Sequence, residues 1–133
     1  MANNYTQATV LPYLPASLFS EMELQQLAFA CCLVHERSDD LLYFYAEDGF
    51  CEESEDQLGD HVNCTELFRA KLKLLCPVAF PHIAIEGATA CSNMRSGGFG
   101  GFAYFITRDT VEFLSTWQWL SRMEAAQMKG IVA

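Results

Sequence analysis

Basic side chains are scarce in this chain. It has eight lysine and arginine residues against 17 aspartate and glutamate residues, a net charge of −9 over 133 residues. Because an acidic surface repels the phosphate backbone of nucleic acids, the composition disfavours direct binding to DNA or RNA. The same charge attracts basic macromolecules, so we expect that a partner protein would present a basic surface.

Long apolar runs and paired cysteine motifs are also absent. No run of about 18 apolar residues occurs, so the sequence has no segment typical of a membrane-spanning helix. The first residues lack the basic and apolar parts of a secretory signal, which predicts a cytoplasmic protein. None of the six cysteines stands in a Cys-x-x-Cys pair, so we expect reduced thiols that fill the core.

The sequence also lacks the short motifs that are typical of catalytic sites. The chain has no Gly-x-Ser-x-Gly elbow, no His-Glu-x-x-His pair and no P-loop lysine. Cys51, His61 and Cys64 are too irregularly spaced to predict a zinc site, and the acids around Cys64 oppose a reactive thiolate. The sequence therefore favours a protein without cofactor, metal or catalytic residues. It leaves the question of an enzyme open, because an active site can assemble from distant positions.

What the chain does contain is ample material for a core. Apolar residues make up 51% of the sequence and aromatic residues 13%. Three segments have the chemistry of a helix start, in which a short polar side chain caps the backbone and an acid follows three residues later. They are Ser20–Glu23, Asn63–Glu66 and Asp109–Glu112. The predicted helices run over about 20–29, over about 64–75 and from about 110 onward.

Between these helices the apolar pattern alternates as in strands. Residues 31–36 and 41–46 flank a polar turn and predict a hairpin, although one long helix through Glu36 is an alternative. Two further strands are predicted at 81–87 and 102–107. The expected fold is α+β: a four-stranded, mainly antiparallel sheet with about three helices packed on one face, in the order α-ββ-α-ββ-α.

The two ends of the chain are expected to differ in structure from the rest of the domain. We expect one domain over residues 1–133, in which residues 1–15 form an extended arm on the core and residues 125–133 a frayed tail. In the third helix, Trp117 and Trp119 lie about 200° apart around the axis, so one indole should point away from the core.

A glycine-rich segment invites a functional interpretation. Residues 97–101 hold four of the eight glycines. Residues Arg95–Gly100, which overlap this segment, resemble the Arg-x-x-Gly-x-Gly pattern with which GNAT-type acetyltransferases hold the pyrophosphate of coenzyme A. The resemblance covers six residues. It implies a small transferase that binds a phosphate-bearing cofactor at the loop 95–101. The aromatic strand pattern that follows, where such a site needs a helix start, favours instead a loop between two strands.

The acidic segment 47–60 carries seven carboxylates and no basic residue. A solvated loop is one interpretation, and a docking surface for a basic partner is the other. Our leading hypothesis is a small acidic, non-enzymatic interaction protein, such as an inhibitor or immunity-like protein that covers a basic surface. A self-associating structural protein, for example a homodimer, is the further alternative. The predicted contact residues are Phe50, Glu52, Glu53, Glu55, Asp56, Arg95, Phe99 and Trp119.

Overall fold

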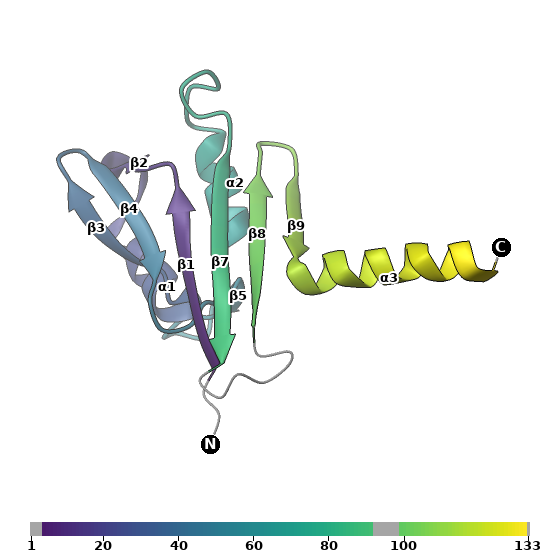
Figure 1. Ribbon diagram of the computed structural model, residues 1–133. Coiled ribbons are helices and arrows are strands. Elements are labelled where there is room, and N and C mark those ends of the chain that lie inside the picture. Colours follow the sequence, from purple (N-terminus) through teal and green to yellow (C-terminus); the bar gives the residue numbers. More distant parts are fainter. Residues whose placement is uncertain (1–3, 92–98, 133) are drawn as a thin grey trace.

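A seven-stranded sheet organises the chain in the computed structural model, which describes residues 4–91 and 99–132 (Figure 1). Its strands follow the order β2-β4-β1-β7-β8-β9, and β3 pairs with β4. The strands of this sheet are β1 Asn4–Leu11, β2 Leu14–Pro15, β3 Val34–Ser38, β4 Leu41–Ala46, β7 Ile83–Cys91, β8 Gly100–Ile106 and β9 Val111–Ser115. A separate hairpin consists of β5 Glu53–Glu55 and β6 His61–Asn63. The helices are α1 Glu21–Cys31, α2 Cys64–Leu72 and α3 Thr116–Val132, with a 3-10 turn at Ala16–Leu18.

The α+β class and the antiparallel character of the sheet are confirmed, but the predicted number of four strands is wrong. Residues 4–11, which we expected in an arm lying on the core, form the inner strand β1. It pairs with β7 from Asn4↔Cys91 to Leu11↔Ala84 and with β4 on its other side. At the other end of the chain, α3 continues to Val132 through most of the predicted tail.

Two of the three predicted helix starts are confirmed. The Ser20 hydroxyl oxygen accepts a hydrogen bond from the Glu23 N–H at 3.1 Å, and the Glu23 carboxylate accepts one from the Ser20 N–H at 2.9 Å. At α2, the Asn63 side-chain oxygen accepts from the N–H groups of Thr65 and Glu66. The first helix ends where Cys32 takes a left-handed conformation with φ of 62°, so the alternative of one helix through Glu36 is wrong.

The third predicted start is wrong, and a different capping box replaces it. Val111–Ser115 is strand β9, paired with β8, and α3 begins only after Ser115. The Ser115 hydroxyl oxygen accepts from the Gln118 N–H, and the Gln118 side chain accepts from the Ser115 N–H, both at 3.1 Å. The prediction that one indole points away from the core understates the exposure, since Trp117 is 73% and Trp119 52% exposed.

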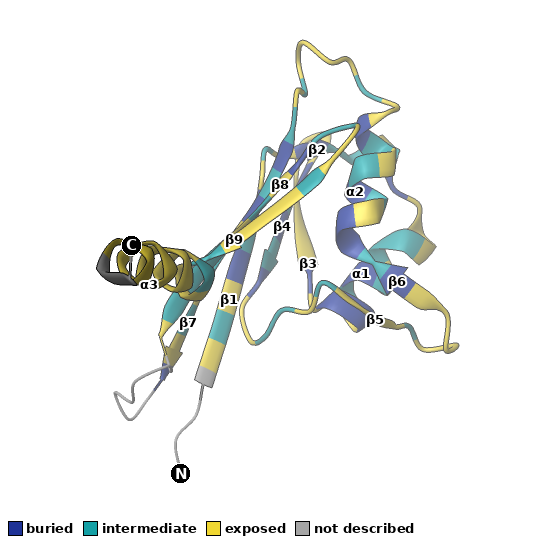
Figure 2. Cartoon of the chain, turned by 90° about the vertical axis from the view of Figure 1, so that its right-hand side faces the viewer, coloured by how far each residue is buried: buried dark blue, intermediate teal, exposed yellow. Residues whose placement is uncertain are grey.

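The core lies between one face of the sheet and the helices α1 and α2 (Figure 2). Phe19, Phe44 and Phe68 meet edge to face, with ring centroids 5.1 to 6.1 Å apart. Every second residue of the inner strands points into this layer, as Val10 and Ile85 do, both fully buried. The two helices therefore cover a single face of the sheet.

A partly buried ion pair joins α1 to α2. The Lys71 ammonium lies 2.8 Å from the Glu23 carboxylate and 5.5 Å from the centre of the Phe19 ring. Burial alone would raise the pKa of Glu23, but the bonds from Lys71 and from the Ser20 amide lower it overall. The same carboxylate thus caps α1 and anchors α2.

The third helix packs on neither face. It leaves the sheet directly after β9 and extends away from it, across the strand direction (Figure 1). No helix among residues 4–91 and 99–132 is long and apolar enough to cross a membrane. The predicted arrangement of three helices on one face therefore holds for α1 and α2 and is wrong for α3.

Gly87 of β7 provides a test of the sheet packing. A methyl group at this position would overlap the ring of Phe102 on β8 and lie 2.7 Å from the carbonyl oxygen of Gln7 on β1. We expect Gly87→Ala to lower the free energy of unfolding by about 1–3 kcal/mol, because both neighbours are held in the sheet. Chemical denaturation measures the change. Gly130→Ala on α3, where the added methyl meets nothing within 4 Å, is the control and should be neutral or stabilising. Equal stability of the two variants would contradict this packing.

Candidate functional site

A hollow of about 360 Å³ opens on the helix-covered face of the sheet, beside the β5–β6 hairpin. Four separate parts of the chain contribute aromatic rings to it, together with the carboxylate of Glu52. We call it the aromatic hollow. Its aromatic residues are Phe50, Phe99, Phe102, Tyr104, Phe113 and Trp117.

Strand alternation places three of these rings on one face. Phe102 and Tyr104 are two residues apart on β8, and Phe113 of β9 is the register partner of Tyr104. The Tyr104 and Phe113 ring centroids are 4.6 Å apart. The absence of a side chain at Gly87 leaves room for the Phe102 ring, so backbone packing and the wall of the hollow are linked.

Phe50 reaches the hollow through a glycine turn after β4. Gly49 adopts a φ of 111°, which favours glycine, and its N–H donates to the Thr6 carbonyl oxygen at 2.8 Å. The turn is thereby fixed to β1. The Phe50 ring then stacks on Phe102 with a centroid separation of 5.7 Å. A loop residue and a strand residue thus form one continuous wall.

Glu52 supplies the charge of the site. Its backbone is held in place, because its carbonyl oxygen accepts from the Cys64 N–H at 2.9 Å and from the Cys31 thiol at 3.5 Å. Burial raises the pKa of Glu52, and the nearby carboxylates of Glu53 and Glu66 raise it further. Burial, followed by the charge of Glu52, raises the pKa of Tyr104 to about 12, so its phenol stays neutral at physiological pH.

These groups suit recognition of a cation. Aromatic faces attract ammonium and guanidinium groups, and a carboxylate beside them compensates the charge. The aliphatic hydroxyls of the lining already serve the fold. Ser115 caps α3, the Thr116 hydroxyl oxygen accepts from the Gly101 N–H at 3.1 Å, and the Thr6 and Thr89 hydroxyls bond to each other at 3.2 Å. The hollow therefore combines side chains of the kinds that can contact a cation.

The thiol considered as a nucleophile lies away from solvent. Cys64 is fully buried at the start of α2. Its hydrogen bond with Cys31, together with burial, raises the pKa of Cys64. A thiol held in this protonated form is poorly suited to nucleophilic attack.

Three of the eight predicted contact residues, Phe50, Glu52 and Phe99, meet at the hollow. Glu53 lies on the hairpin, where its carboxylate accepts from the Asn63 side-chain amide at 3.1 Å and lies 3.2 Å from the His61 Nε2. Glu55 is exposed on the same strand. Arg95, with the first part of the glycine-rich segment, lies outside the described residues. Gly100 and Gly101, the last two glycines of that segment, begin strand β8.

Asp56 and Trp119 take other places. The Asp56 carboxylate organises the hairpin turn by accepting from the N–H groups of Leu58 and Asp60, both at 2.9 Å, and from Gln26 at 3.0 Å. Trp119 lines a separate hollow with Leu114 and Gly101. Our list of contact residues missed four rings of the hollow, and the alternating aromatics of 102–105 were the available signal. The missed rings are Phe102, Tyr104, Phe113 and Trp117.

The acidic segment 47–60 keeps its charge. Within the part of the chain that the structure describes, its carboxylates form no ion pair with a lysine or arginine. Lys71 and Arg69 pair instead with Glu23 and Glu66, outside the segment. The carboxylates of this segment are therefore not neutralised by lysine or arginine, and Glu52 is the member that lines the aromatic hollow.

Comparisons of this chain with protein-family models, with curated proteins and with solved structures find no match.

The raised pKa of Glu52 predicts a specific stability pattern. A folded pKa above the unfolded one means that ionisation of Glu52 disfavours the folded state as the pH rises through it. We therefore expect Glu52→Gln to keep the melting temperature at pH 7 or raise it by up to a few degrees, with a smaller difference near pH 4. Scanning calorimetry at both pH values measures this, with the exposed Glu55→Gln as control. A loss of stability confined to pH 7 would show that the ionised carboxylate supports the fold.

Proposed function

We propose that the protein is a non-enzymatic binding protein whose aromatic hollow receives a basic side chain of a partner protein. The observation that carries this proposal is the position of Glu52 among six aromatic rings, beside an acidic segment free of lysine and arginine partners among the described residues.

The energetics favour a cation over other ligands. Cation–π contacts contribute about 0.5–1 kcal/mol at exposed sites and ~2 kcal/mol where water is removed. The acidic segment adds long-range attraction, which speeds the encounter with a basic surface and weakens with salt. Aromatic anchors supply most of the affinity, while the surrounding carboxylates select the charge of the partner.

The biological form that fits these features is an inhibitor-like or immunity-like protein. Such a protein acts by covering a basic functional surface, and it needs a recessed anchor point and an acidic rim. Phe50 and Glu52 provide the anchor point, and the exposed β5–β6 hairpin with Glu53 and Glu55 provides the rim.

A set of short peptides tests the proposal directly. Peptides with a central lysine, arginine or trimethyl-lysine should quench the fluorescence of Trp117, whereas the acetyl-lysine peptide should not, because its charge is removed. We expect weak dissociation constants, about 0.1–1 mM for a single side chain. Binding should weaken as the pH falls through the raised pKa of Glu52, because protonation removes the carboxylate charge.

Matched variants separate the hollow from general acidity. Glu52→Gln should weaken binding about tenfold, and Glu55→Gln less than about threefold at physiological salt. Phe50→Ala should weaken it as well, whereas Phe29→Ala, which removes an exposed ring from α1, should not. Equal binding of the lysine and acetyl-lysine peptides, or an unchanged Glu52→Gln variant, would contradict the proposal.

A further inference from the structure

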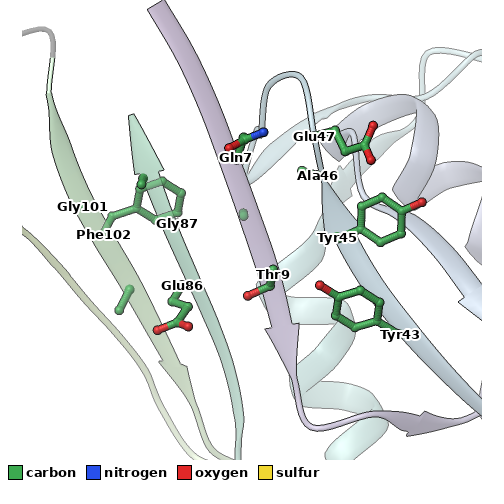
Figure 3. A pocket seen from close by; sticks show the side chains of 13 residues that line it. Gln7, Thr9, Tyr43, Tyr45, Ala46, Glu47, Glu86, Gly87, Gly101 and Phe102 are labelled. Carbon is green, nitrogen blue, oxygen red and sulfur yellow. The ribbon is translucent and has the colours of Figure 1, made fainter. Parts of the chain in front are cut away.

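An open trough crosses the sheet on the face opposite to α1 and α2 (Figure 3). It has a volume of about 590 Å³ and passes over four strands. Small residues make up part of its floor, Gln7 and Glu86 lie among them, and Tyr43 and Tyr45 of β4 stand at one end. A smaller hollow next to Leu114 and Trp119 continues it toward α3. The small residues of the floor are Thr9 on β1, Ala88 on β7, and Gly101 and Ala103 on β8.

Ala88, Gly101 and Ala103, three small apolar residues side by side on two neighbouring strands, are unusual for a surface that faces only water. Large or polar residues normally occupy the exposed face of a half-covered sheet. Small residues permit close approach of another element, as they do where helices pack tightly. The trough passes over four strands, and its small residues leave room for an element that lies across them.

Helix α3 lacks the packing that a helix of its length needs. All its residues from Trp119 to Gly130 are exposed, and Figure 2 shows this along most of the helix. At about 100° per residue, Trp119, Leu120, Met123 and Ala126 fall on one apolar stripe. An isolated helix of 17 residues is only marginally stable in water, because most helical stability comes from burying such a stripe.

The trough and α3 lie at the same level of the sheet. The register runs from Ala46 to Ala8, on to Gly87 and Phe102, and ends at Ser115, which directly precedes α3. The helix leaves the β9 edge across the strand direction, which is also the direction of the trough (Figure 1). A twofold axis parallel to the strands would therefore lay the α3 of each copy along the trough of the other.

We propose that the occupant of the trough is α3 of a second copy of this chain, in a reciprocal homodimer. Charge supports this choice. Glu47 and Glu86 line the trough, and among the described residues neither forms an ion pair. Arg122 and Lys129 lie on one flank of the apolar stripe, and neither pairs with a carboxylate in the part of the chain that the structure describes. Against them α3 carries one carboxylate, Glu124, so this helix has a net positive charge that an acidic trough attracts.

The contact area is sufficient for a stable pair. A helix of this length is about 25 Å long and roughly 10 Å wide, a footprint of about 250 Å². Helix and trough on both copies give about 1,000 Å² in total, and side-chain relief raises the buried area toward the roughly 1,200 Å² of specific interfaces. The inference does not rest on the proposed function, because the aromatic hollow lies on the other face.

Analytical ultracentrifugation of the full chain from about 1 µM to about 1 mM tests the dimer. Met123→Glu, on the stripe, should raise the dissociation constant at least about tenfold. Met128→Glu, on the opposite side of the same helix and similarly exposed, should leave it unchanged. Ala88→Arg, which fills the trough, should have the effect of Met123→Glu.

Charge exchange distinguishes this pairing from any other interface. The variant E47K/E86K and the variant R122E/K129E should each self-associate about tenfold more weakly than the native chain. Mixed together, they should form a heterodimer of native affinity, because both of its helix–trough contacts then pair opposite charges.

Each remaining outcome overturns the inference. A monomer at every concentration does so, and so does a dimer indifferent to Met123→Glu and Ala88→Arg, or a charge-exchanged mixture that does not associate. Binding of a monomeric chain to phosphatidylcholine vesicles through α3 would assign the stripe to lipid instead. Far-UV circular dichroism shows whether a charge variant fails to fold. In that case the comparison of Met123→Glu with Met128→Glu decides whether the apolar stripe of α3 forms the dimer contact.

Discussion

The long pairing of β7 with β1 and β8 is the constraint on which the other features of this protein depend. It fixes eight register positions on one side of β7 and seven on the other. Since side chains alternate between the two faces, that register decides at once which residues enter the core and which remain on the open face. Val10 and Ile85 lie opposite each other beneath the helices, while Thr9 and Glu86 lie opposite each other on the open face. A shift of one residue would exchange the two sets.

The same register couples the two surfaces. Gly87 lies between Ala8 and Phe102, so the Phe102 ring can cross it and form the wall of the aromatic hollow. Its neighbour Ala88 points the other way and contributes to the trough. Two adjacent small residues on one strand therefore serve opposite faces. One makes space for a ring inside the fold, and the other makes space outside it.

Local chemistry was predictable from the sequence, and long-range pairing was not. The caps of Ser20 and Asn63 depend on neighbours within three residues, and both helix starts are confirmed. The predicted helix start at Asp109 is wrong because Val111–Ser115 pairs with β8 as a strand. Pairing with β8 is a long-range contact that a short stretch of sequence does not show. Strand β1 was missed for a related reason. Its alternation is muted, since Thr6 and Ala8 face inward with little apolar bulk, and only its position between β4 and β7 makes it a central strand.

The residues of the candidate site show the same difference between local and long-range features. The acidic segment and Phe50 were visible as composition, and both lie at the edge of the hollow. Phe113 and Trp117 were not recognised, because a helix was expected where β9 carries Phe113 toward Tyr104. Charge can be counted in a sequence, whereas a cluster of rings from four segments exists only after the strands have found their register.

A chain with a net charge of −9 has a specific difficulty in associating with itself, and the two surfaces proposed here address it together. The aromatic hollow with Glu52 and the hairpin with Glu53 and Glu55 lie apart from the open face, so pairing through the trough keeps these carboxylates away from the second copy, and of the acidic segment only Glu47 lines the trough. The contact instead joins Glu47 and Glu86 to α3, whose two cations, unlike those of α2, are in no ion pair among the described residues. A dimer built in this way would present two aromatic hollows outward, and two linked sites bind a repetitive basic partner more tightly than either site alone. Weak recognition of single side chains is then compatible with strong binding of a whole surface.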